Sequence, residues 1–267
     1  MKFFIGVVKQ NIKTYLQYNL SMMISILLQA IILLINIALF KSIYSYNGTA
    51  DIKGYTLDQM IWYFTSAGFV KALTWNFVDG LISRRVMSGE MVMDLLKPVS
   101  FFRLQLANAV GQRVVGFIVE FIPGFAIMSL IYTPRFVTIA SVLKFLLVVS
   151  FSFLLFYLVN YLVGMTAFAM KDNRSIGWMK MMVISFAGGA FIPLEFFPDW
   201  ANRLLDYLPF KYMFYWPVQF FLNKESCQGF GVLLRVLGLQ LVWVVLLYAA
   251  MRILWKLGIR KFCAAGG

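Results

Sequence analysis

The sequence predicts an all-α, polytopic membrane protein that forms one transmembrane domain over residues 1–267. Two observations carry this prediction. Hydrophobic residues make up 61% of the chain and charged residues 13%, whereas soluble domains hold about 45–50% and about 25%, respectively. Apolar runs long enough to cross a hydrocarbon core of about 30 Å also recur along the chain. Because the folded core of a chain of 267 residues cannot enclose so much apolar surface, lipid must cover the rest.

The N-terminal residues 1–19 are expected to form an elbow, an amphipathic helix that lies in the cytoplasmic interface. Apolar residues recur here at helical spacing, whereas Lys2, Lys9 and Lys13 occupy the remaining surface. This pattern is typical of an interfacial helix. Polar residues at short intervals leave no continuous apolar stretch for a cleavable signal peptide. The alternative is a flexible tail that enters the first span.

Six transmembrane helices are predicted after the elbow. The loop Lys41–Asp58 follows the first of them and has Asn47-Gly48 as its turn signal. Pro123 predicts a kink in the third span, and the fifth becomes irregular at Gly188. The predicted spans are Leu20–Phe40, Gln59–Ser83, Leu104–Ile131, Thr138–Met170, a stretch that begins near Trp178, and Gly229–Leu254.

Lysine and arginine are distributed unevenly between the loops. With the N-terminus inside, fourteen of them fall in cytoplasmic segments and eight in or near the outer segments. Cytoplasmic loops of membrane proteins carry such an excess, so both termini are predicted to be cytoplasmic. The net charge of +13 then belongs to these loops. Membrane lipid is the expected partner, and no nucleic acid is expected, because the basic residues lack the aromatic spacing of a nucleic-acid module.

Several kinds of chemistry have little support. The chain contains no His, and its two cysteines, Cys227 and Cys263, lie in different segments. The absence of His removes the commonest acid–base catalyst and metal ligand, and the cysteine spacing predicts neither a disulfide framework nor a metal site. No catalytic, cofactor-binding or metal-binding residue is therefore predicted. An intramembrane enzyme is therefore the least favoured hypothesis for the function of this chain.

Four ionisable residues fall within predicted spans: Lys71, Asp79, Arg113 and Glu120. Such groups cost free energy in lipid and usually face the bundle interior or a water path. Asp79 and Arg113 lie toward the cytoplasmic ends of neighbouring spans and could pair. One hypothesis makes this set the machinery of a secondary transporter or ion-coupled channel, although the two halves of the chain show no convincing repeat. The other gives it a structural role through pairing or snorkelling.

The loop over residues 84–103 is predicted to present a short amphipathic helix to the cytoplasm. Apolar and charged residues alternate there, and Pro98 ends the run. A chain with no soluble domain must receive any energy input through such a feature. A plain interfacial loop is the alternative.

The stretch of residues 187–221 is predicted to form a broken, re-entrant helix pair on the outer side. Glycine and proline interrupt it repeatedly, yet aromatic and aliphatic residues keep it apolar. Broken backbone at membrane depth is tolerated only inside protein or beside a wet cavity. An outer interfacial helix is the alternative. The residues singled out are Gly188, Gly189, Pro193, Pro198, Trp200 and Pro209.

Together these segments resemble the permease subunits of type-2 ATP-binding-cassette (ABC) exporters over nearly the whole chain. The stretch Ile82–Ser100 is similar to the family's basic and apolar helix, followed by Gly89-Glu90, an apolar run and a Leu-x-x-Pro sequence. The outer stretch from Pro193 to Pro209 is similar to the family's re-entrant region. The resemblance implies ATPase-coupling roles for Arg84, Arg85, Gly89, Glu90, Asp94, Leu95, Leu96 and Pro98.

The resemblance also implies partners and a location. The chain has no GxxxxGK[ST] motif, so separate cytoplasmic ABC ATPase subunits would bind ATP and Mg, and this chain would hold no cofactor. A second permease subunit is expected, with a related heteromer favoured over a homodimer. The expected cargo is a drug, peptide, lipid or glycoconjugate, exported across a prokaryotic plasma membrane.

Overall fold

The computed structural model describes residues 2–16, 19–170 and 173–261, and the regular secondary structure of this part of the chain is helical except for one short β-hairpin. The helices are α1 (Lys2–Leu16), α2 (Asn19–Asn47), α3 (Leu57–Thr74), α4 (Val78–Met87), α5 (Met91–Leu95), α6 (Phe101–Gly116), α7 (Ile122–Ile131), α8 (Ile139–Met165), α9 (Arg174–Ala187), α10 (Asp199–Asp206), α11 (Tyr215–Phe221) and α12 (Phe230–Lys261). The hairpin pairs β1 (Asp51–Ile52) with β2 (Tyr55–Thr56) in antiparallel register.

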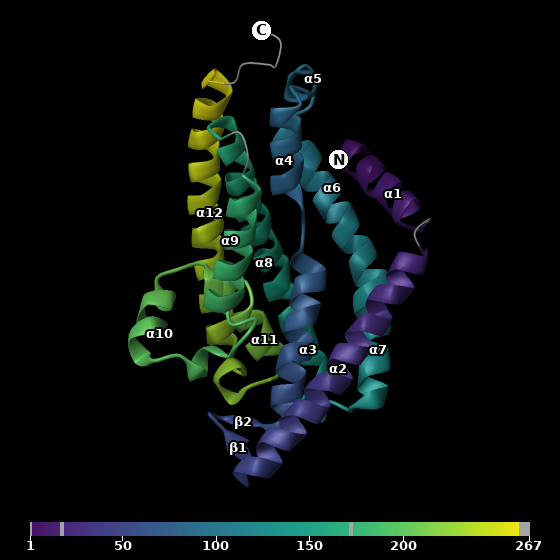
Figure 1. Cartoon of the computed structure of the whole chain (residues 1–267), viewed down its shortest axis with the longest axis vertical. Helices are drawn as coiled ribbons and strands as arrows, with labels where there is room; N and C mark the ends of the chain where they lie inside the picture. The colour runs from purple at the N-terminus through teal and green to yellow at the C-terminus, as the bar shows by residue number, and fades with distance from the viewer. Residues whose placement is uncertain (1, 17–18, 171–172, 262–267) are drawn as a thin grey trace.

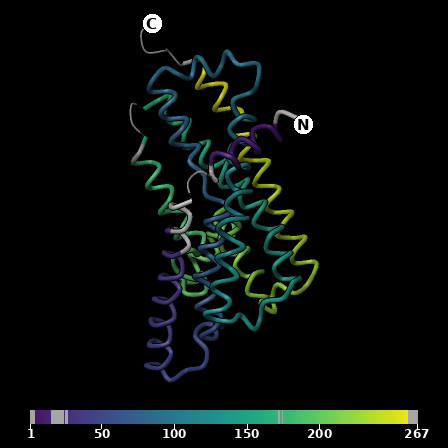
Figure 2. The backbone as a smooth tube through the Cα atoms, turned by 90° about the vertical axis from the view of Figure 1, so that its right-hand side faces the viewer, coloured from purple at the N-terminus to yellow at the C-terminus, as the bar shows by residue number. Residues whose placement is uncertain are grey.

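The helices form an elongated bundle with two distinct ends (Figures 1 and 2). The β-hairpin lies at one end, called here the hairpin end. Helix α1, helix α5 and the last turns of α12 lie at the other, called here the terminal end (Figure 1). Both ends of the described chain therefore share a side with the segment between α4 and α6, as the predicted topology requires.

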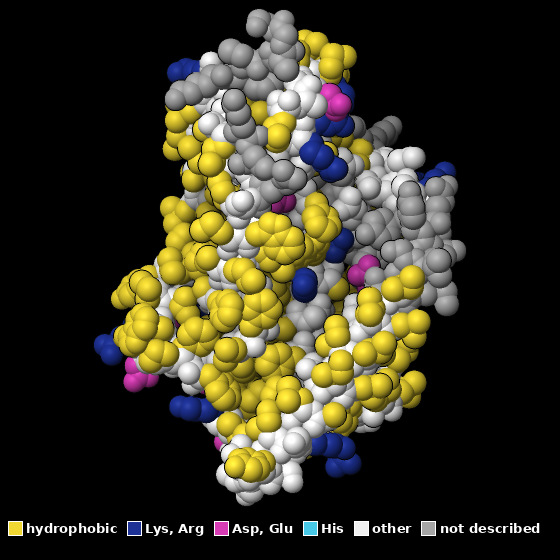
Figure 3. Space-filling model, viewed as in Figure 1, with side chains coloured by type: hydrophobic (Ala, Val, Ile, Leu, Met, Phe, Trp, Pro, Cys, Tyr) yellow, Lys and Arg dark blue, Asp and Glu magenta, His cyan; other side chains and the backbone are white. Residues whose placement is uncertain are grey.

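Within the described residues, four helices are long and apolar enough to cross a membrane. The chain is an all-α polytopic membrane protein. These stretches are Leu27–Asn47, Phe101–Ile131, Ile139–Phe168 and Phe230–Arg260. Hydrophobic side chains cover most of the middle of the face shown in Figure 3, over α9, α10 and α2, and most charged ones lie nearer the two ends. That distribution suits a belt of lipid around the bundle.

The first predicted span is too short. Helix α2 continues past Phe40 to Asn47, through part of the expected polar loop. Its end coincides with the predicted turn signal, because Gly48 has a φ of +62°, a conformation that glycine adopts without the strain of a side chain.

The second predicted span is not one helix. It is divided into α3 and α4, with residues 75–77 non-helical between them. The third span is also irregular, but in the predicted place: a π-helical turn, Phe117–Phe121, directly precedes α7, which carries Pro123 in its first turn. A proline has no N–H and clashes with the carbonyl one turn earlier, so the backbone widens there.

Helix α8 is the centre of the bundle and contacts α3, α4, α9, α11 and α12. Toward the hairpin end it borders a cluster of aromatic rings called here the hairpin-end core. Its rings lie with centroids 5.1 to 6.3 Å apart in the closest pairs. This core comprises Trp62, Phe69, Phe121, Phe125, Phe145 and Phe221. Edge-to-face packing of this kind stabilises the cluster beyond simple area burial.

The segment over residues 187–221 is broken into short helices, as its glycines and prolines predict. Gly189 has a φ of +81°, and its carbonyl accepts a hydrogen bond of 2.6 Å from the Tyr63 hydroxyl. Pro198 precedes α10, which stands at the side of the bundle with Trp200 69% exposed (Figure 1). The chain then returns as α11, which contacts both α3 and α8.

Helix α1 packs against α6 at an angle to the rest of the bundle (Figure 1). The side-chain amide of Asn11 donates to that of Asn108 at 3.2 Å. Phe4 and Ile5 remain exposed, as expected of a helix that lies in an interface.

Candidate functional site

The first candidate site is the chain reversal at the terminal end, residues 84–101, called here the corner. The sequence predicts a short amphipathic helix within the loop over residues 84–103, and the structure has the last turn of α4, the short α5 and a turn at Pro98. Helix α4 does not continue into α5 because Gly89 has a φ of +76°, a left-handed conformation typical of the residue that follows a helix end.

Ion pairs hold the corner closed. The Arg85 guanidinium contacts Glu90 at 2.6 Å and Asp94 at 3.5 Å, and the Lys97 ammonium contacts Asp94 at 2.6 Å. Asp94 is only 3% exposed, so this carboxylate is a buried anchor between two cations. A buried charge is tolerated when it is paired in this way. The predicted residues Arg85, Glu90 and Asp94 are therefore brought together by the fold.

Apolar side chains project from the same corner. Leu96 is 75% exposed, Met93 65% and Leu95 40%, and Pro98 and Arg84 are exposed as well. The corner thus presents a small apolar surface with charges beside it, fixed from below by Asp94. Such a surface suits docking of another protein, because apolar anchors inside a charged rim are the usual anatomy of an interface.

The second candidate site lies where α3 stops and α4 begins, and is called here the polar junction. A break inside a bundle leaves helix-end carbonyls without their helical donors. Side chains replace those donors here. Arg113 donates to the Ala72 carbonyl, the Asn76 amide to the Thr74 carbonyl at 3.2 Å, and the Asn160 amide to the Asn76 carbonyl at 3.0 Å.

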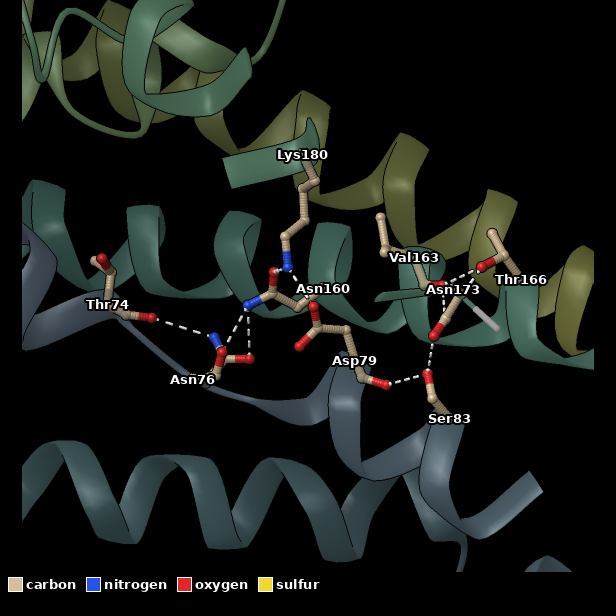
Figure 4. A network of polar contacts seen from close by, with 9 residues as sticks. All are labelled: Thr74, Asn76, Asp79, Ser83, Asn160, Val163, Thr166, Asn173 and Lys180. Carbon is tan, nitrogen blue, oxygen red and sulfur yellow. Dashed lines mark hydrogen bonds and ion pairs between the residues drawn. The ribbon is translucent and has the colours of Figure 1, made fainter. Parts of the chain in front are cut away.

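An ion pair crosses the polar junction from α4 to α9 (Figure 4). The Lys180 ammonium lies 2.5 Å from an Asp79 carboxylate oxygen and 2.5 Å from the Asn160 amide oxygen. The side chains of Lys180 and Asp79 are 13% and 17% exposed. At this burial the two charges interact more strongly than they would on the surface.

The network continues toward the terminal end. The Ser83 hydroxyl bonds to the Asn173 side chain at 2.6 Å, and the Asn173 amide donates to the Val163 carbonyl at 3.1 Å (Figure 4). A cavity of about 710 Å³ borders these groups; its wall includes Phe77, Trp178 and both members of the ion pair. The polar junction is therefore the floor of a large pocket whose remaining lining is mainly apolar.

The four ionisable residues predicted in the spans do not form one cluster. Asp79 pairs with Lys180 rather than with the expected Arg113. Arg113 reaches the Ala72 carbonyl and lies near Glu120, since both approach Gly116. Lys71 is exposed, and its ammonium lies 5.1 Å from the centre of the Trp75 ring.

Sequence reasoning misses Lys180 and the asparagines of the polar junction. The charge distribution assigns Lys180 to the cytoplasmic segments, although it lies between apolar residues of α9. Asn160 likewise interrupts an otherwise apolar stretch of α8. A polar residue inside an apolar run is the signal that could have revealed both, because such residues usually face a partner inside the bundle.

Polar groups at the hairpin end fasten the hairpin to the chain before α12. The Lys224 ammonium donates to the Gly54 carbonyl and lies 3.8 Å from the centre of the Tyr55 ring. Burial lowers the pKa of Lys224 below its ordinary value, and nearby carboxylates such as Glu195 oppose that shift. The Gln219 amide donates to the Tyr55 hydroxyl at 2.6 Å. These contacts connect residues far apart in the sequence without an obvious catalytic arrangement.

No group of three or more His, Cys, Asp or Glu residues gathers as a metal site within the described residues. Among protein families, a model described as "ABC-2 family transporter protein" matches residues 26–266. No curated protein matches the chain.

Proposed function

The chain belongs to the ABC-2 family of transporter proteins and is a membrane permease component of such a transporter, and we propose that it drives export with energy from separate cytoplasmic ATPase subunits. The observation that carries this proposal is the corner. It is an exposed apolar surface, braced by ion pairs, on the same end of the bundle as α1 and the last turns of α12.

The proposed topology has six spans with both termini in the cytoplasm of a prokaryotic cell. The spans are α2, α3 with α4, α6 with α7, α8, α9 and α12. Helix α1 is the interfacial elbow, and residues 187–221 form the outer re-entrant region, with α11 as its inserted part. The excess of Lys and Arg in the segments assigned to the cytoplasm supports this orientation.

The ATPase subunits dock on the corner in this proposal. Leu95, Leu96 and Pro98 supply apolar contact, with Arg84 and Glu90 at the edge. Arg85, Asp94 and the turn at Gly89 hold these residues in place. ATP and Mg are bound by the ATPase partner and not by this chain.

Movement at the corner reaches the spans through α4. This helix is short, and the non-helical residues 75–77 separate it from α3. The Asp79–Lys180 pair connects it to α9. A push on the corner therefore tilts α4 about the polar junction and displaces α9, which makes α4 a hinged lever. Hinges of this kind use a few residues at the ends of helices.

The transport pathway needs a second permease subunit, since six spans enclose little space by themselves. A related but different subunit is favoured over a second copy of this chain, and a two-fold or pseudo-two-fold axis would relate the pair. The mainly apolar cavity over the polar junction suits an amphipathic cargo with a polar head, such as a drug, peptide, lipid or glycoconjugate.

The docking role is tested by placing a charge on the corner. Leu96→Asp is expected to reduce co-purification of the ATPase subunits and ATP hydrolysis by the complex at least tenfold, because a charged side chain would be desolvated at the interface. Leu204→Asp, on the exposed face of α10, is the matched control and should leave both unchanged. Equal ATPase retention in the two variants, with normal membrane insertion, would refute the assignment.

A second candidate function is ion-coupled transport through the Asp79–Lys180 pair beside its cavity, with Lys71, Arg113 and Glu120 as further relay groups. The location of a titratable pair at a cavity favours it. Transport in sealed vesicles separates the two candidates. Uptake driven by a proton gradient without ATP supports ion coupling, and uptake that requires the ATPase and ATP supports the export proposal.

A further inference from the structure

A second cavity lies behind the corner and shares no lining residue with the cavity over the polar junction. It measures about 680 Å³ and is lined by the turn after α5, the first turn of α6, Tyr161 of α8 and one face of α12. The Phe101 ring stacks on Trp255 with centroids 5.7 Å apart. This stacking connects α6 to α12 across the cavity.

Cations dominate the charge of this cavity. Lys97, Arg103 and Arg252 line it, with Asp94 as the carboxylate among the lining residues. Asp94 is already paired with Arg85 and Lys97. Among the residues that the structure describes, Arg103 and Arg252 form no ion pair. The wall therefore carries uncompensated positive charge that an anion would neutralise.

Neutral hydrogen-bond donors face the same space. Helix α6 begins at Phe101, and the Ser100 side chain does not cap it within the described structure. Its first N–H groups and its helix dipole are thus available to an anion. Tyr161 is 0% exposed, and its hydroxyl has no hydrogen-bond partner among the described residues. A buried hydroxyl without a partner is costly, and a ligand oxygen in the cavity would satisfy it.

The position of the cavity indicates the source of that anion. Tyr248 and Trp255 line it from α12, and both residue types are enriched where helices meet the lipid headgroups. Met251 and Phe102 add apolar wall beside the arginines. Basic pockets between helices at the cytoplasmic surface suit lipid phosphates. A free phosphate would use the same cations, but it would leave the apolar wall without a ligand.

We propose that this cavity binds the headgroup phosphate of an anionic glycerophospholipid from the leaflet at the terminal end. Arg103 and Arg252 pair with the phosphate, the N-terminus of α6 and the Tyr161 hydroxyl donate to it, and the apolar wall contacts the start of the acyl chains. The bound lipid braces the corner against α12. This binding is independent of ATP hydrolysis and of the docking role proposed for the corner.

Lipid binding is tested with the purified full-length protein in phosphatidylcholine nanodiscs that contain phosphatidylglycerol, with bound lipid counted by native mass spectrometry. The double variant Arg103→Gln with Arg252→Gln is expected to weaken phosphatidylglycerol binding about fivefold for each arginine removed. The control is Lys256→Gln with Arg260→Gln. It removes the same charge from α12 outside the cavity lining and should retain the lipid.

A milder variant guards against misfolding. Tyr161→Phe keeps the ring and removes only the hydroxyl, and it is expected to weaken phosphatidylglycerol binding several-fold without lowering the unfolding temperature of the lipid-free protein. Equal binding by the wild type and all variants would overturn the proposal. Displacement of phosphatidylglycerol by inorganic phosphate at similar affinity would overturn the assignment to lipid. Retention of phosphatidylglycerol with no displacement by inorganic phosphate supports it.

Discussion

The two halves of the bundle are built differently. At the hairpin end, six aromatic side chains from four helices and the π turn fill the interior, and Phe221 among them is 0% exposed. At the terminal end, two cavities of about 710 and 680 Å³ separate the helices, and ion pairs connect α4 to α9 and α4 to α5. The hairpin end is packed around one aromatic cluster, whereas the terminal end combines a smaller hydrophobic cluster of α4, α6, α8 and α12 with two cavities and these ion pairs.

This difference indicates where the protein can move. Close-packed interiors resist deformation, because each displaced ring must find a new site. Polar contacts beside cavities can exchange partners with little change in volume. A lever that turns at the polar junction therefore moves against a hairpin end that stays fixed. Substitutions at the two ends should therefore differ in their effects on the free energy of unfolding and on transport.

The largest effect on stability is expected at the hairpin-end core. Phe221→Ala should lower the free energy of unfolding by about 3 kcal/mol, near the lower end of the range for core phenylalanines. In a membrane protein, transfer of the ring from the core into lipid costs little, so the loss comes mainly from missing packing contacts. Denaturant unfolding in mixed micelles measures this effect. Leu130→Ala, at a side chain that is 87% exposed, is the control and should change it little. A Phe221→Ala loss as small as that of the control would mean that the core is not tightly packed.

A smaller loss of stability but a larger loss of function is expected at the polar junction. Lys180→Met leaves the Asp79 carboxylate without its cation and should cost about 2 kcal/mol, less than a fully buried pair, since the cavity admits water. The transport rate in proteoliposomes should be largely lost, although the variant protein stays folded.

The partner variant sharpens this prediction. Adding Asp79→Asn to Lys180→Met removes the unpaired charge, so part of the lost stability should return, whereas transport should not, because the connection to α9 is still missing. If the double variant transports as well as the wild type, the ion pair is structural and the lever does not depend on it.

The smallest effect concerns the loop after α7. Its Tyr132 hydroxyl donates to Asp58, and burial, with Asp58 beside it, raises the pKa of Tyr132 from 10.0 to about 12. The folded state thus holds this proton more tightly than the unfolded state, so the stability that it contributes is complete below pH 10 and is lost as pH rises to about 12. In unfolding measurements, Tyr132→Phe should show a shallower decline across this window. An equal decline of the unfolding free energy with pH in the wild type and in Tyr132→Phe would contradict the assignment of this pKa shift to Tyr132.

Much of the fold follows from apolar run lengths and from helix breakers. The N-terminal helix, the irregularity beside Pro123 and the broken segment after Gly188 could all be predicted, because each depends on local residue types. The break between α3 and α4 could not. Residues 74–77, Thr-Trp-Asn-Phe, contain neither proline nor glycine, and the helix stops there because side chains from other helices satisfy its carbonyls.

The candidate sites likewise include contacts that local sequence patterns predict and contacts that they do not predict. The residues of the corner are close in the sequence, so the local pattern suffices to group Arg85, Glu90 and Asp94. The partner of Asp79 is 101 residues away, and Lys180 resembles a loop charge because it lies near the start of a short span. Pairings at this separation depend on how helices pack, which the pattern of one segment does not specify.

The most direct test of the lever is a distance measured with and without nucleotide. Spin labels at Met93 and Leu130, in the complete transporter with Cys227 and Cys263 replaced by serine, report the corner against the hairpin end by double electron–electron resonance. Labels at Tyr46 and Leu130 report the hairpin end alone. If α4 acts as a hinged lever, ATP shifts the first distance by several ångströms and leaves the second unchanged. An unchanged first distance, or equal shifts in both, would contradict it.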